Sequence, residues 1–115
     1  ECRTLGQGIA KAIGETDYPV VIVASSDMSH YVSHNTAKKK DKMAIDRILD
    51  LDPEGLFTTV TEEGISMCGY LPATIMLFAA QSLGARKARL IRYATSGEVS
   101  GDYDHVVGYA GIIIS

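Results

Sequence analysis

Two short segments carry side chains that could do chemistry together. The first is the polar stretch Ser25–Tyr31, in which Asp27 lies three residues before His30. A carboxylate at this spacing can orient an imidazole or share a ligand with it, and histidine is the side chain best suited to move protons near neutral pH. The alternative interpretation of this stretch is an Asx-turn next to a surface histidine.

Cys68 lies in the second segment, just before a predicted helix that starts at Pro72. The positive end of the helix dipole favours a thiolate at this position, and Gly69 and Pro72 leave the sulfur uncrowded. The alternative is an inert core thiol, which is the commoner role of an isolated free cysteine. We assign Cys2, in a predicted terminal helix, to that inert class.

Asp27, His30 and Cys68 allow two kinds of site. Cysteine-dependent hydrolysis would need the sulfur within reach of the imidazole and an oxyanion hole, and neither can be read from the sequence. One thiolate, one imidazole and one carboxylate also form a suitable set for a transition metal, although their spacing matches no closed zinc motif. A metal site would therefore need another ligand or two from elsewhere.

Other polar features carry less chemistry. The segment Thr95–Tyr103 follows a predicted strand but lacks the lysine and the spacing of a phosphate-binding loop, so we interpret it as a turn-rich connection. His34 and His105 have no partners nearby in the sequence and are expected to be surface residues.

The elements that must position the first segment are a helix and a strand. A helix is predicted over residues 3–13, with Gly14 as its stop. The continuous β-branched run at residues 20–24 predicts a strand that is covered on both faces, as in parallel sheets. Residues 25–35 are then expected to be a loop at the carboxyl end of this strand, where α/β sheets bind ligands.

Three helices and two strands are predicted after this loop. The helices cover residues 36–49, a stretch that opens at Asp52-Pro53 and runs through Val60, and residues 73–83 with Gly84 as the end. The strands cover residues 88–94 and 106–114, and Gly108 and Gly111 indicate a close backbone approach or a bulge. The order predicts an α/β fold, part of a helix-flanked sheet that is mostly parallel or mixed.

Composition limits the classes of function. The 115 residues suffice for one domain, with 46% hydrophobic and 22% charged residues. A net charge of −3 and a pI near 5.5 argue against nucleic-acid binding, and the lysines at 38–40 are interpreted as a solvated helix face. The sequence shows neither a membrane span nor a signal peptide, and two cysteines indicate a reducing, cytoplasmic setting.

Three ordered motifs resemble the Memo family. They are Ser-Ser-Asp-Met-Ser-His-Tyr at 25–31, Cys-Gly-Tyr-Leu-Pro-Ala at 68–73 and Tyr-Ala-Thr-Ser-Gly-Glu-Val-Ser-Gly-Asp-Tyr at 93–103, and Val-Val-Gly-Tyr-Ala-Gly follows at 106–111. Prokaryotic members are often described as protein B of the AmmeMemoRadiSam system. By this resemblance, residues 1–115 are the C-terminal portion of a single Memo-like domain whose N-terminal half is absent.

The resemblance implies a fold similar to class III extradiol dioxygenases, the LigB-like group. Those enzymes hold a non-haem iron with two histidines and a carboxylate, and a further histidine acts as acid/base. By motif, His30 corresponds to the acid/base histidine, Asp27 lies beside it, and Cys68 occupies the position of the carboxylate ligand. The two metal-binding histidines belong to the N-terminal half, and a thiolate ligand favours copper(I) or zinc over iron.

The leading hypothesis is a Memo-like protein with a dioxygenase-like, metal-binding and redox-active pocket. Cys68 would be a metal ligand, His30 a proton-handling group or a further ligand, and Asp27 its orienting partner. The alternative is a non-catalytic scaffold whose vestigial pocket binds a peptide or a partner protein, and cysteine-dependent hydrolysis ranks third. The expected partners are the N-terminal half of the same protein and the other AmmeMemoRadiSam proteins, and the expected cofactor is copper, zinc or iron.

Overall fold

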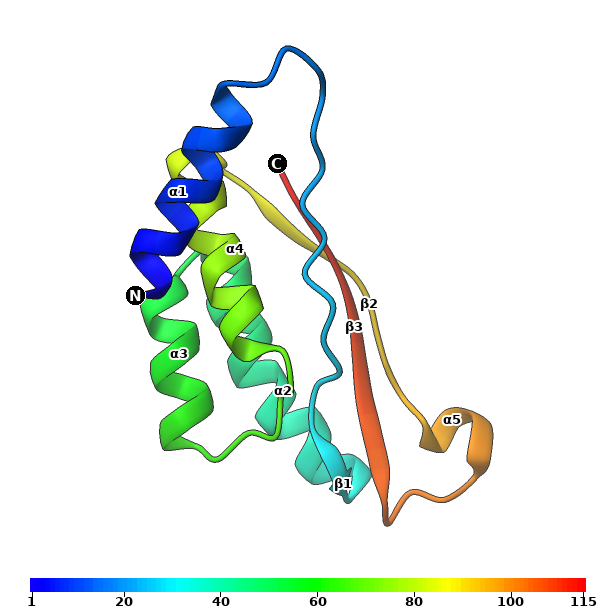
Figure 1. Cartoon of the computed structure of the whole chain (residues 1–115). Helices are drawn as coiled ribbons and strands as arrows, with labels where there is room; N and C mark the ends of the chain where they lie inside the picture. Colours follow the sequence, from blue (N-terminus) through cyan, green and yellow to red (C-terminus); the bar gives the residue numbers. More distant parts are fainter.

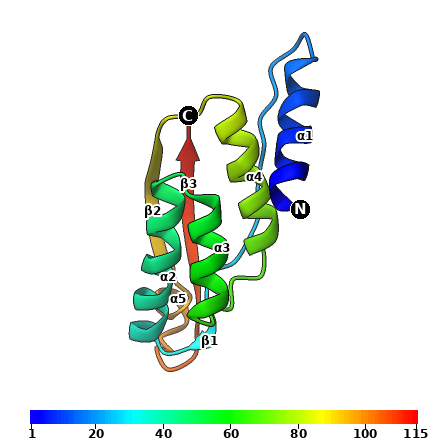
Figure 2. The ribbon, with the colours of Figure 1, turned by 90° about the vertical axis from the view of Figure 1, so that its left-hand side faces the viewer.

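Helices and strands form two layers in the computed structural model, which describes all of residues 1–115. The helices are α1 (Cys2–Gly14), α2 (His34–Leu49), α3 (Pro53–Glu62), α4 (Tyr70–Ser82) and the short α5 (Gly97–Ser100), and the strands are β1 (His30–Val32), β2 (Ala88–Thr95) and β3 (Val106–Ile114). Figures 1 and 2 show α2, α3 and α4 on one side of the strands, while α1 packs against α4. The α/β class is therefore confirmed.

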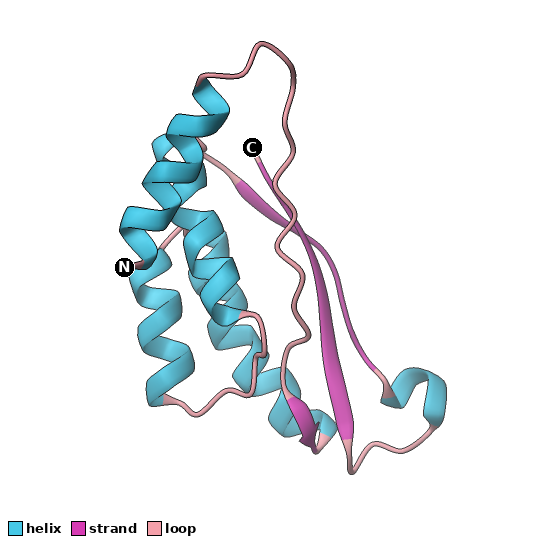
Figure 3. Cartoon of the chain, viewed as in Figure 1, coloured by secondary structure: helices cyan, strands magenta, loops and turns pink.

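The sheet is antiparallel throughout, so the prediction of a mostly parallel or mixed sheet was wrong. Its order is β1-β3-β2, and β2 pairs with β3 from Ala88↔Ile114 to Thr95↔Gly108. The connection between these two strands, residues 96–105, reverses the chain directly (Figure 3). A parallel pair would need a longer crossover, usually through a helix packed on the sheet.

Both glycines of β3 have the roles that the sequence indicated. The register shifts between Leu90 and Arg92, so that β2 bulges where it faces Gly111. At Gly108, an added Cβ would lie 2.1 Å from a carboxylate oxygen of Asp41 on α2. Gly108 therefore permits a close approach of α2 to the sheet, and Gly111 lies at a bulge.

The strand predicted at residues 20–24 is absent, which corrects a second expectation. Figure 3 draws this segment as a loop, and residues 19–27 make no backbone-to-backbone hydrogen bond. Val21 and Val23 are 85% and 82% exposed instead of buried on both faces. A β-branched run forms a strand only where a neighbouring strand pairs with its peptide groups, and no strand of this chain does so.

The helix boundaries follow the predicted caps closely. The Asp52 side chain accepts the Gly55 N–H at the start of α3, and Gly84 follows α4 with a left-handed φ of +86°. The first residues of two helices differ from the prediction. α4 begins at Tyr70, which places Pro72 in its first turn, and α2 begins at His34. The expected loop at residues 25–35 is therefore shorter, and it contains β1.

The core lies between the helices and the inner face of the sheet. Its fully or nearly fully buried apolar residues are Met28, Ala44, Ile45, Ile48, Leu56, Val60, Ile65, Met67, Ala73 and Leu77. Burial of each large side chain among them contributes about 1.5–3 kcal/mol to folding. None of the five helices has the length and the apolar character needed to cross a membrane.

Candidate metal site

Two core methionines fix the segments that carry the candidate ligands. Met28 and Met67 are 3% and 4% exposed, and each is the immediate neighbour of a candidate ligand, Asp27 or Cys68. Because successive side chains of an extended chain point to opposite sides, burying these methionines turns Asp27 and Cys68 outward. The sequence thus brings two distant segments to one place through the core.

The structure brings together all three predicted site residues. One ligand atom from each of Asp27, His30 and Cys68 lies within 4.8 Å of the other two. The closest pair is His30 Nε2 and Asp27 Oδ2, which are 3.5 Å apart. His30 and Asp27 are partly exposed, and Cys68 is exposed, so the cluster lies at the surface of this chain.

The Ser26 hydroxyl joins the two segments directly. It accepts the Gly69 N–H at 2.8 Å, donates to the Asp27 carbonyl at 2.7 Å and lies 3.8 Å from Cys68 Sγ. At Gly69, a Cβ would come within 2.6 Å of the Ser26 Cβ. A side chain at residue 69 would therefore push apart the segments that hold Asp27 and Cys68.

Ser66 sets the orientation and the tautomer of His30. The His30 N–H donates to Ser66 Oγ at 2.7 Å, and His30 Nδ1 contacts the carbonyl oxygen of Ser66. A carbonyl oxygen only accepts hydrogen bonds, so Nδ1 must carry the proton. In the neutral ring, the lone pair is then on Nε2, which is the nitrogen that faces Asp27, as in metal-binding histidines with an oriented second shell.

The buried carboxylate of Asp41 holds the segment Ser25–Tyr31 in place through hydrogen bonds to Ser29. Asp41 on α2 is fully buried, and its Oδ1 accepts both the Ser29 N–H at 2.9 Å and the Ser29 hydroxyl at 2.6 Å. Its Oδ2 accepts the Tyr93 hydroxyl of β2 at 2.6 Å. The pKa of Tyr93 is raised well above its usual range. Burial is the largest cause, followed by the hydrogen bond to Asp41, the charge of Asp41 and the charge of Glu98.

Sequence reasoning missed Asp41, although a signal for it existed. Asp41 falls at helical spacing between Ala37 and the buried residues Ala44, Ile45 and Ile48, so it lies on the apolar face of α2. A charged residue on the buried face of a helix requires partners, and here they come from the site segment and from β2.

The donor set fits a transition metal better than a hydrolytic triad. Ligand atoms around one tetrahedral ion lie about 3.5 Å apart, so small side-chain movements would bring the cluster to this spacing. Thiolate, imidazole and carboxylate all bind zinc and related metals. In contrast, the only hydrogen bond of the Cys68 sulfur is with Ser26 and none joins it to His30, as a cysteine nucleophile and its base would require.

The other two histidines lie outside this cluster. His34 was expected to be a surface residue, but it is half-buried, its Nδ1 lies 2.8 Å from Thr95 Oγ1 and its ring packs edge-on against Tyr103. It therefore ties the start of α2 to the end of β2. His105 is an exposed residue next to Asp102, as expected.

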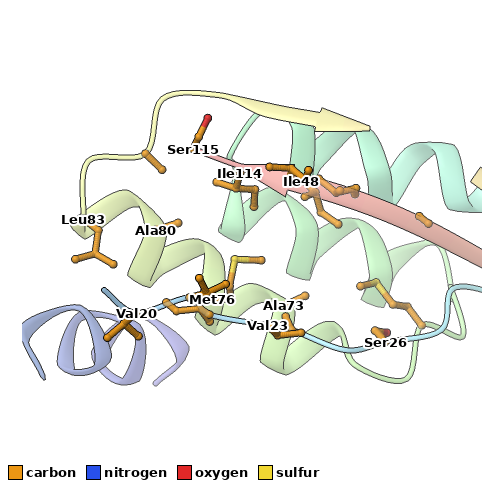
Figure 4. A pocket seen from close by; sticks show the side chains of 18 of the residues that line it. Val20, Val23, Ser26, Ile48, Ala73, Met76, Ala80, Leu83, Ile114 and Ser115 are labelled. Carbon is orange, nitrogen blue, oxygen red and sulfur yellow. The ribbon is translucent and has the colours of Figure 1, made fainter. Parts of the chain in front are cut away.

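An apolar cavity of about 630 Å³ adjoins the site. It separates residues 20–24 from β3 and α4, and Figure 4 shows Val20, Met76 and Ile114 among its lining residues. Ser26 also lines this cavity, so the same hydroxyl that joins the site segments marks the cavity's boundary with the site.

Comparisons with known proteins agree over the whole chain. The family model for the Memo-like protein matches residues 1–113. A MEMO1 family protein of Methanococcus maripaludis strain C5 is 46% identical over 110 residues, and one of Methanopyrus kandleri is 43% identical over 111 residues. Each match covers 96% of this chain but 39% of the relative, so the chain spans about two fifths of the length of these curated relatives.

Proposed function

This chain belongs to the Memo-like protein family, and we propose that Asp27, His30 and Cys68 form one wall of a transition-metal pocket in the longer protein. In this pocket, the Cys68 thiolate and His30 Nε2 bind the metal, and the Asp27 carboxylate, which faces the same nitrogen at 3.5 Å, is available as a third ligand. A thiolate with an imidazole favours copper(I) or zinc over iron. When bound, the metal would supply a Lewis-acidic or redox-active centre to a dioxygenase-like pocket.

The observation that carries the proposal is the convergence of three different donors from two separate segments. Their ligand atoms lie within 4.8 Å of one another, and the Nδ1 contact with the Ser66 carbonyl leaves the His30 Nε2 lone pair free toward the cluster. The His30 ring and the His30 backbone N–H both bond to Ser66, so the orientation of the ring is fixed at two points. Orientation of a histidine through its second nitrogen is a general feature of metal sites.

We further propose that the rest of the longer protein completes both the pocket and the sheet. Three donors leave at least one position of a tetrahedral ion open, and the cluster lies at the surface of this chain. The apolar residues 20–24 also lack a pairing strand here. Because the relatives are much longer than this chain, their remaining length can supply both the missing ligands and the missing strands of a LigB-like sheet.

Metal analysis of the full-length protein tests the pocket. We expect the wild-type protein to retain close to one zinc or copper ion per chain, and Cys68→Ser to weaken binding at least tenfold. Cys2→Ser is the matched control, because Cys2 is the other free cysteine and lies in α1, outside the cluster. It should bind metal like the wild type.

Two results would overturn the proposal. One is a correctly folded wild-type protein that binds neither zinc nor copper, which would favour the non-catalytic scaffold instead. The other is equal metal affinity in Cys68→Ser and Cys2→Ser, which would exclude Cys68 as a ligand.

A further inference from the structure

Asp41 has a position that stability alone does not explain. Its carboxylate is fully buried on the apolar face of α2, and no lysine, arginine or histidine lies within ion-pair distance. Burying a carboxylate without a counterion is costly, and replacing buried charged groups with well-packed apolar residues is often neutral or stabilising. This points to a benefit of Asp41 in the conformation that its three hydrogen bonds select.

The conformation that Asp41 selects is that of Ser29. One oxygen, Oδ1, accepts both the backbone N–H and the hydroxyl of Ser29, so this residue is held at two atoms. The Gly108 N–H donates to the Ser29 carbonyl at 2.9 Å, while the Met28 N–H donates to the Gly108 carbonyl at 2.8 Å. With both its peptide groups and its side chain bonded, Ser29 has no freedom to rotate.

Fixing Ser29 also fixes its neighbour His30. The two residues share a peptide bond, and the His30 N–H is itself bonded to Ser66 Oγ. If Ser29 moved, the His30 ring could no longer meet the Ser66 carbonyl and Asp27 at the same time. The absence of a side chain at Gly108 is part of this arrangement, because a Cβ there would occupy the place of the Asp41 carboxylate.

We propose that Asp41 is the positioning residue of the metal pocket, which it serves by holding Ser29 so that His30 presents Nε2 toward Asp27 and Cys68. Asp41 touches none of the three metal donors and acts on the pocket only through Ser29. Its functional meaning rests on the proposed metal site, but its effect on His30 exists whether or not a metal is bound.

The experiment uses the metal-free, full-length protein and reads the His30 ring directly. ¹⁵N NMR of the imidazole nitrogens distinguishes the two neutral tautomers, and His30→Ala identifies the signals. We expect the Nδ1–H tautomer to dominate in the wild type and the two tautomers to mix in Asp41→Leu. Asp41→Asn should stay close to the wild type, because its amide oxygen can still accept from Ser29.

Tyr93→Phe is the matched control, because it tests whether Asp41 only stabilises the fold. It removes the other hydrogen bond of the same carboxylate and leaves both Ser29 bonds in place, so the tautomer should stay as in the wild type. Zinc competition on the same proteins should give roughly a 10- to 100-fold weaker affinity for Asp41→Leu alone. If Asp41→Leu does not fold, Ser29→Ala replaces it, and a smaller tautomer shift is expected.

The two proposals fail in different ways. A wild-type tautomer in folded Asp41→Leu, or in Ser29→Ala where Asp41→Leu does not fold, would overturn the positioning role. A wild-type protein that binds no metal would overturn the pocket, and the tautomer measurement would still decide what Asp41 does.

Discussion

The two ends of the segment at residues 20–30 differ in how much of their environment this chain supplies. At the His30 end, β1 pairs with β3, Ser29 is bonded to Asp41, and the neighbouring Met28 is buried in the core. At the other end, Val20–Val23 lie beside β3 without bonding to it, across an apolar cavity of about 630 Å³. The backbone around His30 is thus held by partners within the chain, and the apolar half of the segment is not.

This difference separates a polar stretch that finds partners within the 115 residues from an apolar stretch that does not. Polar groups at the site have specific partners, and no buried side-chain nitrogen or oxygen lacks one. In contrast, Val21 and Val23 expose their apolar side chains to water, which costs about 25 cal/mol per Å² of exposed apolar area. The site segment is therefore held in place by contacts within this chain, whereas residues 20–24 are not.

The largest expected effect comes from breaking the apolar half in the full-length protein. If the rest of a longer protein covers residues 20–24 as proposed, Val21→Asp should lower the free energy of unfolding by about 3 kcal/mol, because the new charge would be buried. Val99→Asp, at a valine that is 95% exposed on α5, is the control and should change stability by less than about 0.5 kcal/mol. Denaturant unfolding measures both, and equal, small effects would mean that residues 20–24 stay uncovered.

A second comparison, between two glycines of β3, tests the polar half. Gly108→Ala should cost about 2–3 kcal/mol, since the new methyl group would lie 2.1 Å from Asp41 Oδ2 and 2.9 Å from Tyr93 Oη. Gly111→Ala has no atom within 4 Å of the added Cβ and should be nearly neutral. Thermal unfolding of the two variants gives the difference, and a well-tolerated Gly108→Ala would show that the Asp41 contact is not tight.

Features that depend on local contacts could be predicted from the sequence, and features that depend on distant contacts could not. Caps such as Asp52 and Gly84 act locally, so the helices were found with ends that differ by a few residues. The prediction of a strand at residues 20–24 was wrong because strand pairing is not a local property, and no strand of this chain pairs with these residues. Asp27, His30 and Cys68 were correctly grouped, but only the motif resemblance joined two segments that the core brings together.

The smallest expected effect concerns Tyr93 and alkaline pH. Tyr93→Phe should cost about 1.5–2 kcal/mol at neutral pH, because it leaves one oxygen of the buried Asp41 carboxylate without its hydrogen bond. Because folding raises the pKa of Tyr93, the unfolded chain loses this proton first, near the ordinary tyrosine value of about 10. The wild type should therefore lose its advantage over Tyr93→Phe as pH rises above about 10.

Urea unfolding of both proteins across this pH range measures the effect. All other tyrosines and lysines are common to the two proteins, so their titration cancels in the difference. An advantage that grows with pH would contradict the raised pKa.

X-ray absorption at the zinc edge of the zinc-loaded, full-length protein determines whether Cys68 and His30 bind the metal. We expect one sulfur ligand at about 2.3 Å and at least one imidazole nitrogen at about 2.0 Å, with the sulfur signal lost in Cys68→Ser and kept in Cys2→Ser. A wild-type spectrum with only oxygen and nitrogen ligands, or a sulfur signal that survives in Cys68→Ser, would contradict this expectation.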